Sequence, residues 1–283
     1  MTIALERGGA RRRKPAEPAR IVLLAWMALV FVFLFLPIFV VVLYSFNGGR
    51  NLYVWTEFSP YWYGEALSNP RVVSALVVSL EAALINAAIA VSLGVPAGIA
   101  LARRKGKWVG PFLVALFVIL GTPELVSAIG QMIWFDRIGL FNGLIRLAIG
   151  HSLFNIAVVV LIVRARAEGL SETLEEAAAD LGAVPWRSFF QITLPLMFPA
   201  VLASVLLSFT FSFDDVIISL FVQRPGTSTL PIRILSSFKP GLKGDVAAIV
   251  VLTLLVSLAG VLAAALLLRR GDRRGQPLGG MLD

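Results

Sequence analysis

Apolar residues gather in six long stretches, and shorter polar segments separate them. The stretches cover about 21–46, 72–101, 108–135, 148–165, 197–222 and 245–268. Each approaches the ~20 residues that an α-helix needs to cross the hydrocarbon core of a bilayer, although Arg164 limits the fourth. The pattern therefore predicts an all-α membrane protein with six transmembrane helices.

The polar segments divide the chain into a membrane region and two tails. We expect a basic tail at 1–20, a transmembrane domain at 21–270 with its core at 72–268, and a second tail at 271–283. The first apolar stretch is about 26 residues long, whereas the core of a secretory signal has ~7–15, and no small-residue cleavage site closes it. It is therefore expected to remain as a membrane anchor.

Composition and charge placement support this interpretation. The chain is 58% hydrophobic and only 15% charged, which is far more apolar than a soluble domain needs. A cytoplasmic N-terminus would place most of the 25 basic residues inside, and the positive-inside rule then favours both termini in the cytoplasm. Nucleic-acid binding is disfavoured, because no basic patch is interleaved with exposed aromatic residues. The basic residues placed inside are Arg7, Arg11, Arg12, Arg13, Lys14, Arg20, Arg103, Arg104, Lys105, Lys107, Arg164, Arg166, Arg187, Arg269, Arg270, Arg273 and Arg274.

The sequence carries few residues suited to catalysis. It has no cysteine and one histidine, His151, which is interpreted as a packing or interface residue. It also lacks the GxxxxGK[ST] phosphate-binding loop, so energy for any active process must come from a partner. We expect no catalytic site, metal or cofactor in this chain.

Four acidic residues interrupt the apolar stretches, namely Glu81, Glu124, Asp214 and Asp215. A charge in the membrane costs several kcal/mol unless it faces water or a partner. At about 1.5 Å per residue, Glu81 lies roughly 13 Å and Asp214 roughly 12 Å below the outer ends of their stretches. Glu124 follows Pro123, whose missing amide hydrogen predicts a kink or an unwound turn.

These acids suggest the charge of a transported solute. No intramembrane Lys or Arg accompanies them, and an acidic pathway favours an organic cation such as a polyamine over an anion. Asp214 is slightly preferred to Asp215, because adjacent residues point about 100° apart on a helix. The alternative remains that some of these acids pair with polar residues of neighbouring helices or cap kinks.

The loop 168–195 is the largest internal polar segment, and its local signals predict two short helices. Ser171 is expected to cap the first helix, whose first turns are acidic, and Gly182 to end it. Pro185 suits the first turn of the second helix. A helix, a break and a second helix should result on the cytoplasmic side.

The same loop carries a spaced motif: Glu-Ala-Ala, three residues, Gly, nine residues, then Ile-x-Leu-Pro. It resembles the cytoplasmic signature of the permease subunits of bacterial ABC importers, here of the type I permease fold. The resemblance implies that this loop docks into a groove of a separate ATPase subunit, which binds ATP and Mg²⁺. An amphipathic surface loop with accidental alanines is the alternative. The matching residues are Glu176, Ala177, Ala178, Gly182, Ile192, Leu194 and Pro195.

A second resemblance concerns the end of the fifth stretch and the loop after it. This region resembles the PotC-type permease subunits of spermidine/putrescine importers. It implies transport of a polyamine across the bacterial inner membrane, with a second permease subunit, a pair of ATPase subunits and a periplasmic binding protein as partners. The matching residues are Ser212, Phe213, Asp214, Asp215, Pro225, Gly226, Thr227, Thr229, Leu230 and Pro231.

Two alternatives stay open. Members of the wider importer group carry other small organic solutes. The resemblance therefore limits the class of substrate without naming the molecule. Six apolar stretches with intramembrane acids are also compatible with a secondary transporter or channel that works without an ATPase.

Overall fold

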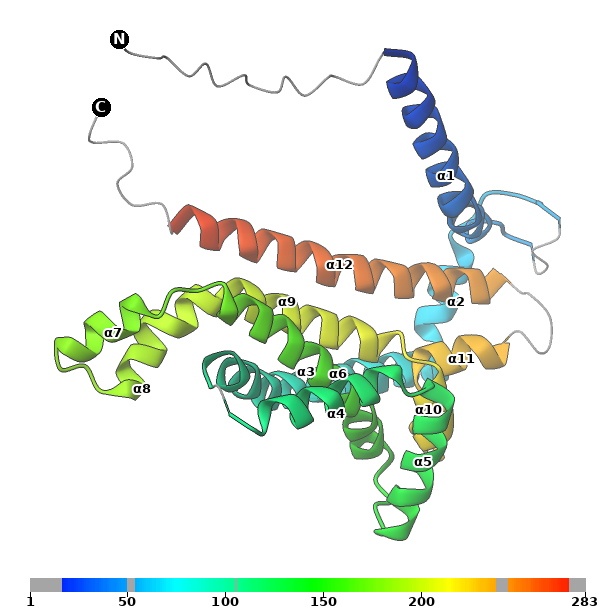
Figure 1. Ribbon diagram of the computed structural model, residues 1–283. Helices are drawn as coiled ribbons and strands as arrows, with labels where there is room; N and C mark the ends of the chain where they lie inside the picture. Colours follow the sequence, from blue (N-terminus) through cyan, green and yellow to red (C-terminus); the bar gives the residue numbers. More distant parts are fainter. Residues whose placement is uncertain (1–16, 50–53, 105, 238–243, 275–283) are drawn as a thin grey trace.

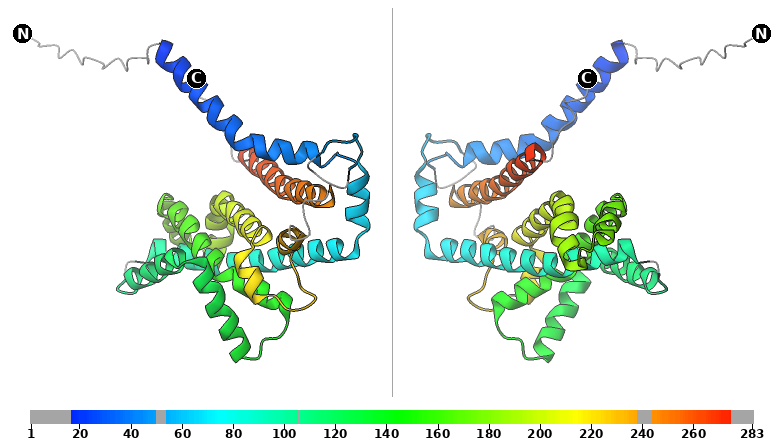
Figure 2. Two further views of the ribbon diagram at one scale, coloured as in Figure 1. Left: turned by 90° about the vertical axis from the view of Figure 1, so that its right-hand side faces the viewer. Right: turned by 90° about the vertical axis from the view of Figure 1, so that its left-hand side faces the viewer.

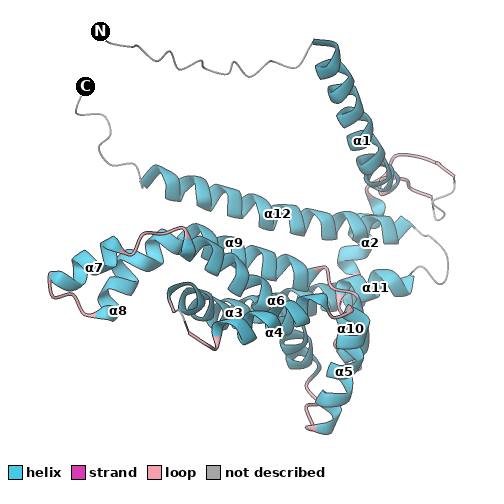
Figure 3. Ribbon diagram, in the orientation of Figure 1, coloured by secondary structure: helices cyan, strands magenta, loops and turns pink. Residues whose placement is uncertain are grey.

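The computed structural model describes residues 17–49, 54–104, 106–237 and 244–274, and helices dominate this part of the chain (Figures 1 and 3). The only β-type pairing in the described residues is an isolated bridge between Asn47 and Phe58. The helices are α1 (Glu17–Tyr44), α2 (Tyr61–Ser68), α3 (Pro70–Arg103), α4 (Val109–Gly121), α5 (Glu124–Arg137), α6 (Gly143–Glu168), α7 (Thr173–Asp180), α8 (Pro185–Ser188), the π-helix η1 (Phe189–Thr193), α9 (Leu194–Phe213), α10 (Ile217–Val222), α11 (Leu230–Ser237) and α12 (Gly244–Arg274).

Within the described ranges, five helices could each cross a membrane by length and composition, and a sixth crossing is added if one bent helix pair forms a single span. Five single helical segments are long and apolar enough to cross a bilayer: Arg20–Tyr44, Pro70–Arg103, Gly143–Glu168, Pro185–Phe213 and Gly244–Ala263. The sixth is a pair, α4 and α5, bent by 102° at a short break. The prediction of an all-α membrane protein is confirmed, and its third apolar stretch forms two helices, a broken span or a re-entrant loop, in place of one continuous helix.

The break between α4 and α5 lies at the predicted position. Thr122 is extended, with ψ 128°, and α5 begins at Glu124 directly after Pro123. Proline has no amide hydrogen to continue the ladder of α4 and disfavours helical backbone in the residue before it. The first turn of α5 therefore starts at this bend, with Glu124 exposed beside it.

The fifth apolar stretch is not one helix, and here the prediction was wrong. α9 ends at Phe213, and α10 starts at Ile217 after a short non-helical segment. A carboxylate oxygen of Asp215 accepts a hydrogen bond from the amide of Ser219 (2.7 Å), which satisfies a donor in the first turn of α10. Two adjacent acids therefore occupy a break inside the membrane region.

The start of the fourth span was also placed wrongly, because the apolar window opens five residues after the helix begins. α6 starts at Gly143 and includes Arg146, which is 1% exposed. The Arg146 guanidinium contacts Asp136 (2.5 Å), donates to the Leu140 carbonyl (3.2 Å) and lies over the Phe135 ring. A basic residue therefore lies within a span, and its carboxylate partner offsets its burial. Arg164 does not end α6, which continues to Glu168.

The core is formed by α3, α6 and α9, which pack together along most of their length (Figure 2). α3 and α6 approach closely at Gly94, where an added Cβ would lie 2.6 Å from a methyl of Val159. Small residues permit such close packing of membrane helices. Asn86 ties the three together: its Nδ2 donates to the Ser208 carbonyl of α9 (2.8 Å), and its Oδ1 accepts from Asn155 of α6 (3.2 Å).

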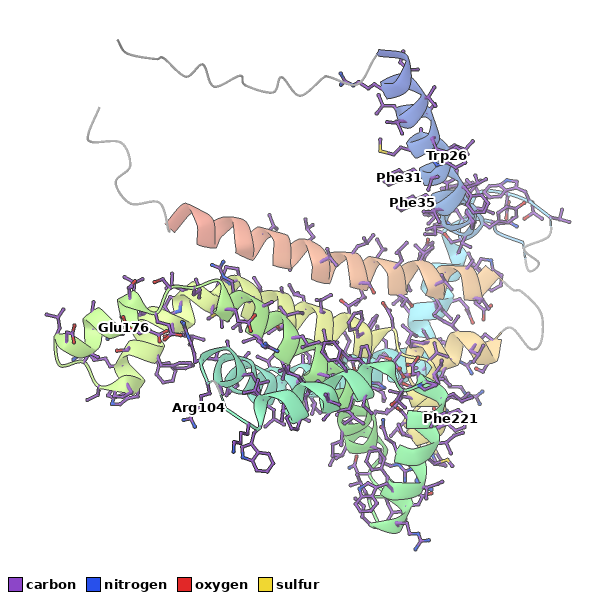
Figure 4. The ribbon with its side chains drawn as sticks, in the orientation of Figure 1. Trp26, Phe31, Phe35, Arg104, Glu176 and Phe221 are labelled. Atoms are coloured by element: carbon purple, nitrogen blue, oxygen red, sulfur yellow. The ribbon has the colours of Figure 1, made fainter. Side chains whose placement is uncertain are left out.

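α1 lies at the periphery. None of its apolar window Arg20–Tyr44 is buried, and the helix rises away from the core beside α12 (Figures 1 and 2). Trp26, Phe31 and Phe35 on this helix are all more than half exposed (Figure 4). A side-chain surface that is apolar all round suits a helix surrounded by lipid or by another membrane helix.

Candidate functional site

The loop 168–195 has the predicted helix, break and helix. α7 spans Thr173–Asp180, and Gly182 follows with φ +81°, a left-handed conformation that favours glycine. The amide of Ala183 donates to the Ala178 carbonyl (2.9 Å), a 6→1 bond that closes the helix end. The predicted start is displaced by one residue: Glu172 is the N-cap, while Ser171 Oγ accepts from the Thr173 amide.

The face of α7 that carries the motif points away from the core. None of the eight residues of α7, all of them described, is buried. Figure 4 places Glu176 at the far edge of the molecule, opposite Phe221 on α10. Large apolar side chains surround this helix, with Leu181 89%, Trp186 68% and Phe190 59% exposed. Exposed apolar side chains are typical of surfaces that contact another protein or the membrane.

The other motif residues lie where the loop re-enters the membrane. Ile192 is in η1, and Leu194 and Pro195 begin α9. The amide of Leu194 donates to the Phe189 carbonyl, five residues back, and Pro195 has no amide to donate. A single π-turn therefore joins α8 to α9. Such turns are found mostly at functional positions in helices.

A cavity of about 770 Å³ lies at the other end of α9 from α7, between the α4–α5 bend, α6 and the α9–α10 break. Three of the four predicted acids, Glu124, Asp214 and Asp215, line it. They come from positions about 90 residues apart in the sequence, and both helix breaks open onto the same space. The structure thus brings together carboxylates that the sequence could only place at similar depths.

Glu81 is not among the residues that line this cavity, and its place in a transport pathway stays a prediction. It lies on an exposed stripe of α3 with Val77 and Leu84. Equal depth along two helices does not bring two residues together when their helices present different faces.

Asp214 and Asp215 both line the cavity but have different partners. Asp214 accepts a long hydrogen bond from Ser257 of α12 (3.4 Å) and also lines a second hollow of about 450 Å³ beside α11 and α12. Asp215 is 3.1 Å from Nε2 of His151, and its side chain is only 7% exposed. The argument that only one of them can face the pathway assumed a continuous helix, which ends at Phe213.

His151 is a residue whose role the sequence did not reveal. It is 2% exposed, and its Nδ1 lies 2.6 Å from Ser212 Oγ while its Nε2 lies 3.1 Å from Ser219 Oγ. The ring therefore bridges α9 and α10 across the break and holds Asp215 in place. The expectation of a packing role is met in part, because this packing also orients a carboxylate on the cavity wall.

The rest of the wall offers acceptors and aromatic faces. Asn155 Oδ1 and Gln131 Oε1 are buried without a hydrogen-bond partner among the described residues. Buried acceptors without donors are destabilising until a donor arrives. Phe154 and Phe211 meet edge to face at the wall, with ring centroids 6.0 Å apart. A ligand that carries several N–H donors and positive charge fits this lining, and aromatic faces also attract cations.

Comparison with known proteins identifies the class to which this fold and loop belong. The family described as "Binding-protein-dependent transport system inner membrane component" matches residues 94–273, which include the whole coupling motif and the cavity. The chain belongs to this family. It is a multi-pass inner-membrane permease subunit of an ABC importer, which works with a substrate-binding protein, and a separate ATPase hydrolyses the ATP.

Three named permease proteins are similar to this chain over most of its length. The chain is 35% identical over 267 residues to the putrescine transport system permease protein PotI of Escherichia coli (strain K12), which covers 91% of this chain and 94% of the relative. It is 35% identical over 247 residues to the spermidine/putrescine transport system permease protein PotC of the same organism, covering 86% and 92%. The PotC protein of Haemophilus influenzae is 33% identical over 248 residues, covering 88% and 96%.

Solved structures show the same fold. A chain of a bacterial ABC transporter that imports the acidic polysaccharide alginate matches with a TM-score of 0.70, at 16% identity, covering 90% of this chain and 98% of that one. A chain of the MetNI methionine ABC transporter in inward-facing conformations matches with a TM-score of 0.61, at 15% identity, covering 72% and 99%. The predicted importer permease fold is confirmed.

Proposed function

We propose that this permease subunit moves a polyamine, most simply putrescine or spermidine, across the inner membrane by alternating access. The observation that carries the proposal is the cavity at the two helix breaks, where Glu124, Asp214 and Asp215 converge. A protonated diamine supplies positive charge to balance these carboxylates and N–H donors for Asn155 Oδ1 and Gln131 Oε1, acceptors with no partner among the described residues, while its methylene chain suits the apolar part of the lining. The polyamine permeases among the relatives support the same class of solute.

The second part of the proposal concerns coupling. Glu176, Ala177, Ala178 and Gly182 form the surface that an ATPase subunit contacts, and the two alanines and the glycine are small enough to allow a close approach. Ile192, Leu194 and Pro195 set the turn by which α8 continues into the span. ATP and Mg²⁺ are bound by the ATPase, and this chain holds no cofactor. The basic tails and the loop 168–195 then lie on the cytoplasmic side, with both termini inside.

The third part concerns assembly. The cavity wall includes exposed side chains such as Phe154 and Phe211, and a second, similar permease subunit would close it from that side. Two ATPase subunits would bind the two coupling loops, and a periplasmic binding protein would deliver the solute. Closure of the ATPases and docking of the binding protein would then bias two arrangements of the same helices.

The test is reconstitution of the permease with its ATPase, a second permease subunit and a periplasmic binding protein. The binding protein is titrated with putrescine, spermidine, ornithine and a neutral diol in a calorimeter, and uptake of the tightest ligand into proteoliposomes is then measured. The proposal expects polyamine binding and ATP-dependent polyamine uptake. Selection of an anionic or neutral solute would overturn the substrate class, and uptake by this chain without an ATPase would overturn the mechanism.

A further inference from the structure

Arg103, the last residue of α3, holds the coupling loop from inside. Its Nη1 is 3.0 Å from Glu172 and donates to the Leu170 carbonyl (3.2 Å), and its Nη2 is 3.2 Å from Glu175. One planar guanidinium thus binds three positions of the loop at the start of α7. Arginine suits this because its fork presents several donors in fixed directions.

Glu175 extends the contact to the next span. The same oxygen, Oε1, that meets Arg103 also accepts a hydrogen bond from Oγ1 of Thr193 (2.8 Å), and Thr193 is 6% exposed. Thr193 is the last residue of the π-turn, directly before α9. One carboxylate therefore joins α3, α7 and α9 at the cytoplasmic side of the core.

These polar contacts matter because apolar packing does little to fix α7. No side chain of this fully described helix is buried, and a hollow of about 300 Å³ separates it from the π-turn, with Ile99, Ala179 and Phe189 on its walls. A helix held over a hollow moves unless directional bonds fix its distance and angle. Those bonds are the ones made by Glu175.

Glu175 and Glu176 therefore differ in role although they are neighbours. Glu176 is exposed on the outer face, within the motif that would meet the ATPase, whereas Glu175 turns inward to Arg103 and Thr193. The side chains of adjacent helical residues point about 100° apart, so one helix turn can present both functions. α9, which begins at the inner contact, ends next to Asp214 on the cavity wall.

We propose that Arg103, Glu175 and Thr193 form a strut that positions the coupling helix and transmits its displacement to α3 and α9. These three are positioning residues: they act through α7 and α9 and touch neither nucleotide nor solute. The inference rests on the proposed function, in which α7 contacts the ATPase. It adds residues that lie outside the spaced motif.

The test measures the number of putrescine molecules transported per ATP hydrolysed by the complete complex in proteoliposomes. Putrescine-loaded binding protein is present throughout. Arg103→Gln should lower this ratio about tenfold while the ATPase remains bound, a smaller loss than for a fully buried charge pair because Glu172 and Glu175 are partly exposed. Arg104→Gln is the matched control, because Arg104 is the exposed neighbour, and it should leave the ratio unchanged.

A second readout separates transmission from general damage. Because the chain has no cysteine, Asp180→Cys on α7 and Phe198→Cys on α9 can carry spin labels in a complex whose other subunits are cysteine-free. The distance distribution should be narrow in this background and broad after Thr193→Val, a replacement of similar volume that removes only the hydroxyl donor. If the Arg103→Gln complex fails to assemble, the ratio of putrescine transported to ATP hydrolysed is measured on the Thr193→Val complex instead.

The outcomes are distinguishable. An unchanged transport ratio in Arg103→Gln and Thr193→Val, or an unchanged distance distribution, would overturn the strut while leaving putrescine import intact. Failure of the wild-type complex to import putrescine would instead overturn the proposed function, and the distance measurement would still decide whether the strut fixes α7.

Discussion

The outer face of α7 and the wall of the acid-lined cavity are the two candidate functional regions, and they are built in opposite ways. The first is a contiguous helix with no buried residue among those described, and in the proposed function an ATPase subunit covers it. The second is assembled from two helix breaks and a buried histidine, and its acids already have partners such as His151 and Ser257. A surface for a protein can be left exposed, whereas a site for a small ion must be organised in advance.

The contrast predicts that changes in the two regions affect different quantities. A change on α7 should alter binding of the ATPase and the yield of transport from ATP. A change in the cavity should alter transport of the solute while leaving assembly intact.

The largest effect is expected from Gly182→Asp. The left-handed φ of +81° costs a non-glycine residue about 1–2 kcal/mol, and the new charge stands where the ATPase would approach. Uptake should fall roughly hundredfold, as for a central interface residue, with the membrane level of the protein maintained. Uptake and co-purification of the ATPase measure this.

Gly139→Ala is its control, since Gly139 also has positive φ (+69°) but lies between α5 and α6. This variant should have the same kind of backbone strain as Gly182→Asp but should bind the ATPase normally. Normal uptake by Gly182→Asp at normal protein levels would contradict the assignment of the α7 surface.

Asp214→Asn comes next. It keeps the shape of the cavity wall and removes one negative charge, so a diammonium ion loses one attractive partner. We expect uptake to fall about tenfold, which corresponds to roughly 1.4 kcal/mol. ATPase stimulation by the loaded binding protein should persist in this variant. If both uptake and stimulation stay at wild-type values, Asp214 has no part in cation transport.

His151→Ala should have a mixed effect. It leaves Ser212, Ser219 and Asp215 without their shared partner. Each buried polar group left unpaired destabilises the folded state by about 1–3 kcal/mol. The thermal unfolding temperature should drop, and uptake should fall several-fold because Asp215 loses its contact with His151 and keeps the hydrogen bond from the Ser219 amide. Ser152→Ala, a buried change on the same helix whose hydroxyl bonds only the Ala148 carbonyl, should do neither. Equal behaviour of the two variants would remove the positioning role of His151.

The smallest effect is expected from Glu81→Gln. Its side chain is exposed on α3 and away from the cavity, so uptake should change by less than about twofold, within the usual range of surface substitutions. A loss as large as that of Asp214→Asn would place Glu81 in the pathway and enlarge the site beyond this cavity.

Local sequence signals predicted the α7 region well, because each signal acts on its own neighbours. Gly182 ends a helix and Pro185 begins one through backbone restrictions that need no tertiary contact. The same holds for Pro123, which breaks α4 from α5. Only the cap was displaced, from Ser171 to Glu172, a one-residue difference of the kind usual at helix ends.

The cavity was less accessible to such reasoning, because it depends on which faces of distant helices meet. The break after Phe213 has no proline or glycine to announce it, so a continuous helix was predicted. Arg146 was placed outside the membrane, since its partner Asp136 lies in another helix. His151 and Asn155 are single polar residues in an apolar run, and only packing shows that they meet α9.

The most direct test of the account is accumulation of putrescine by the reconstituted complex, followed with and without ATP and with and without the binding protein. The account predicts concentrative uptake only when both are present, with Gly182→Asp uncoupled from the ATPase and Asp214→Asn still coupled but slow. Uptake that proceeds without ATP, or that is equally lost together with ATPase binding in both variants, would contradict it.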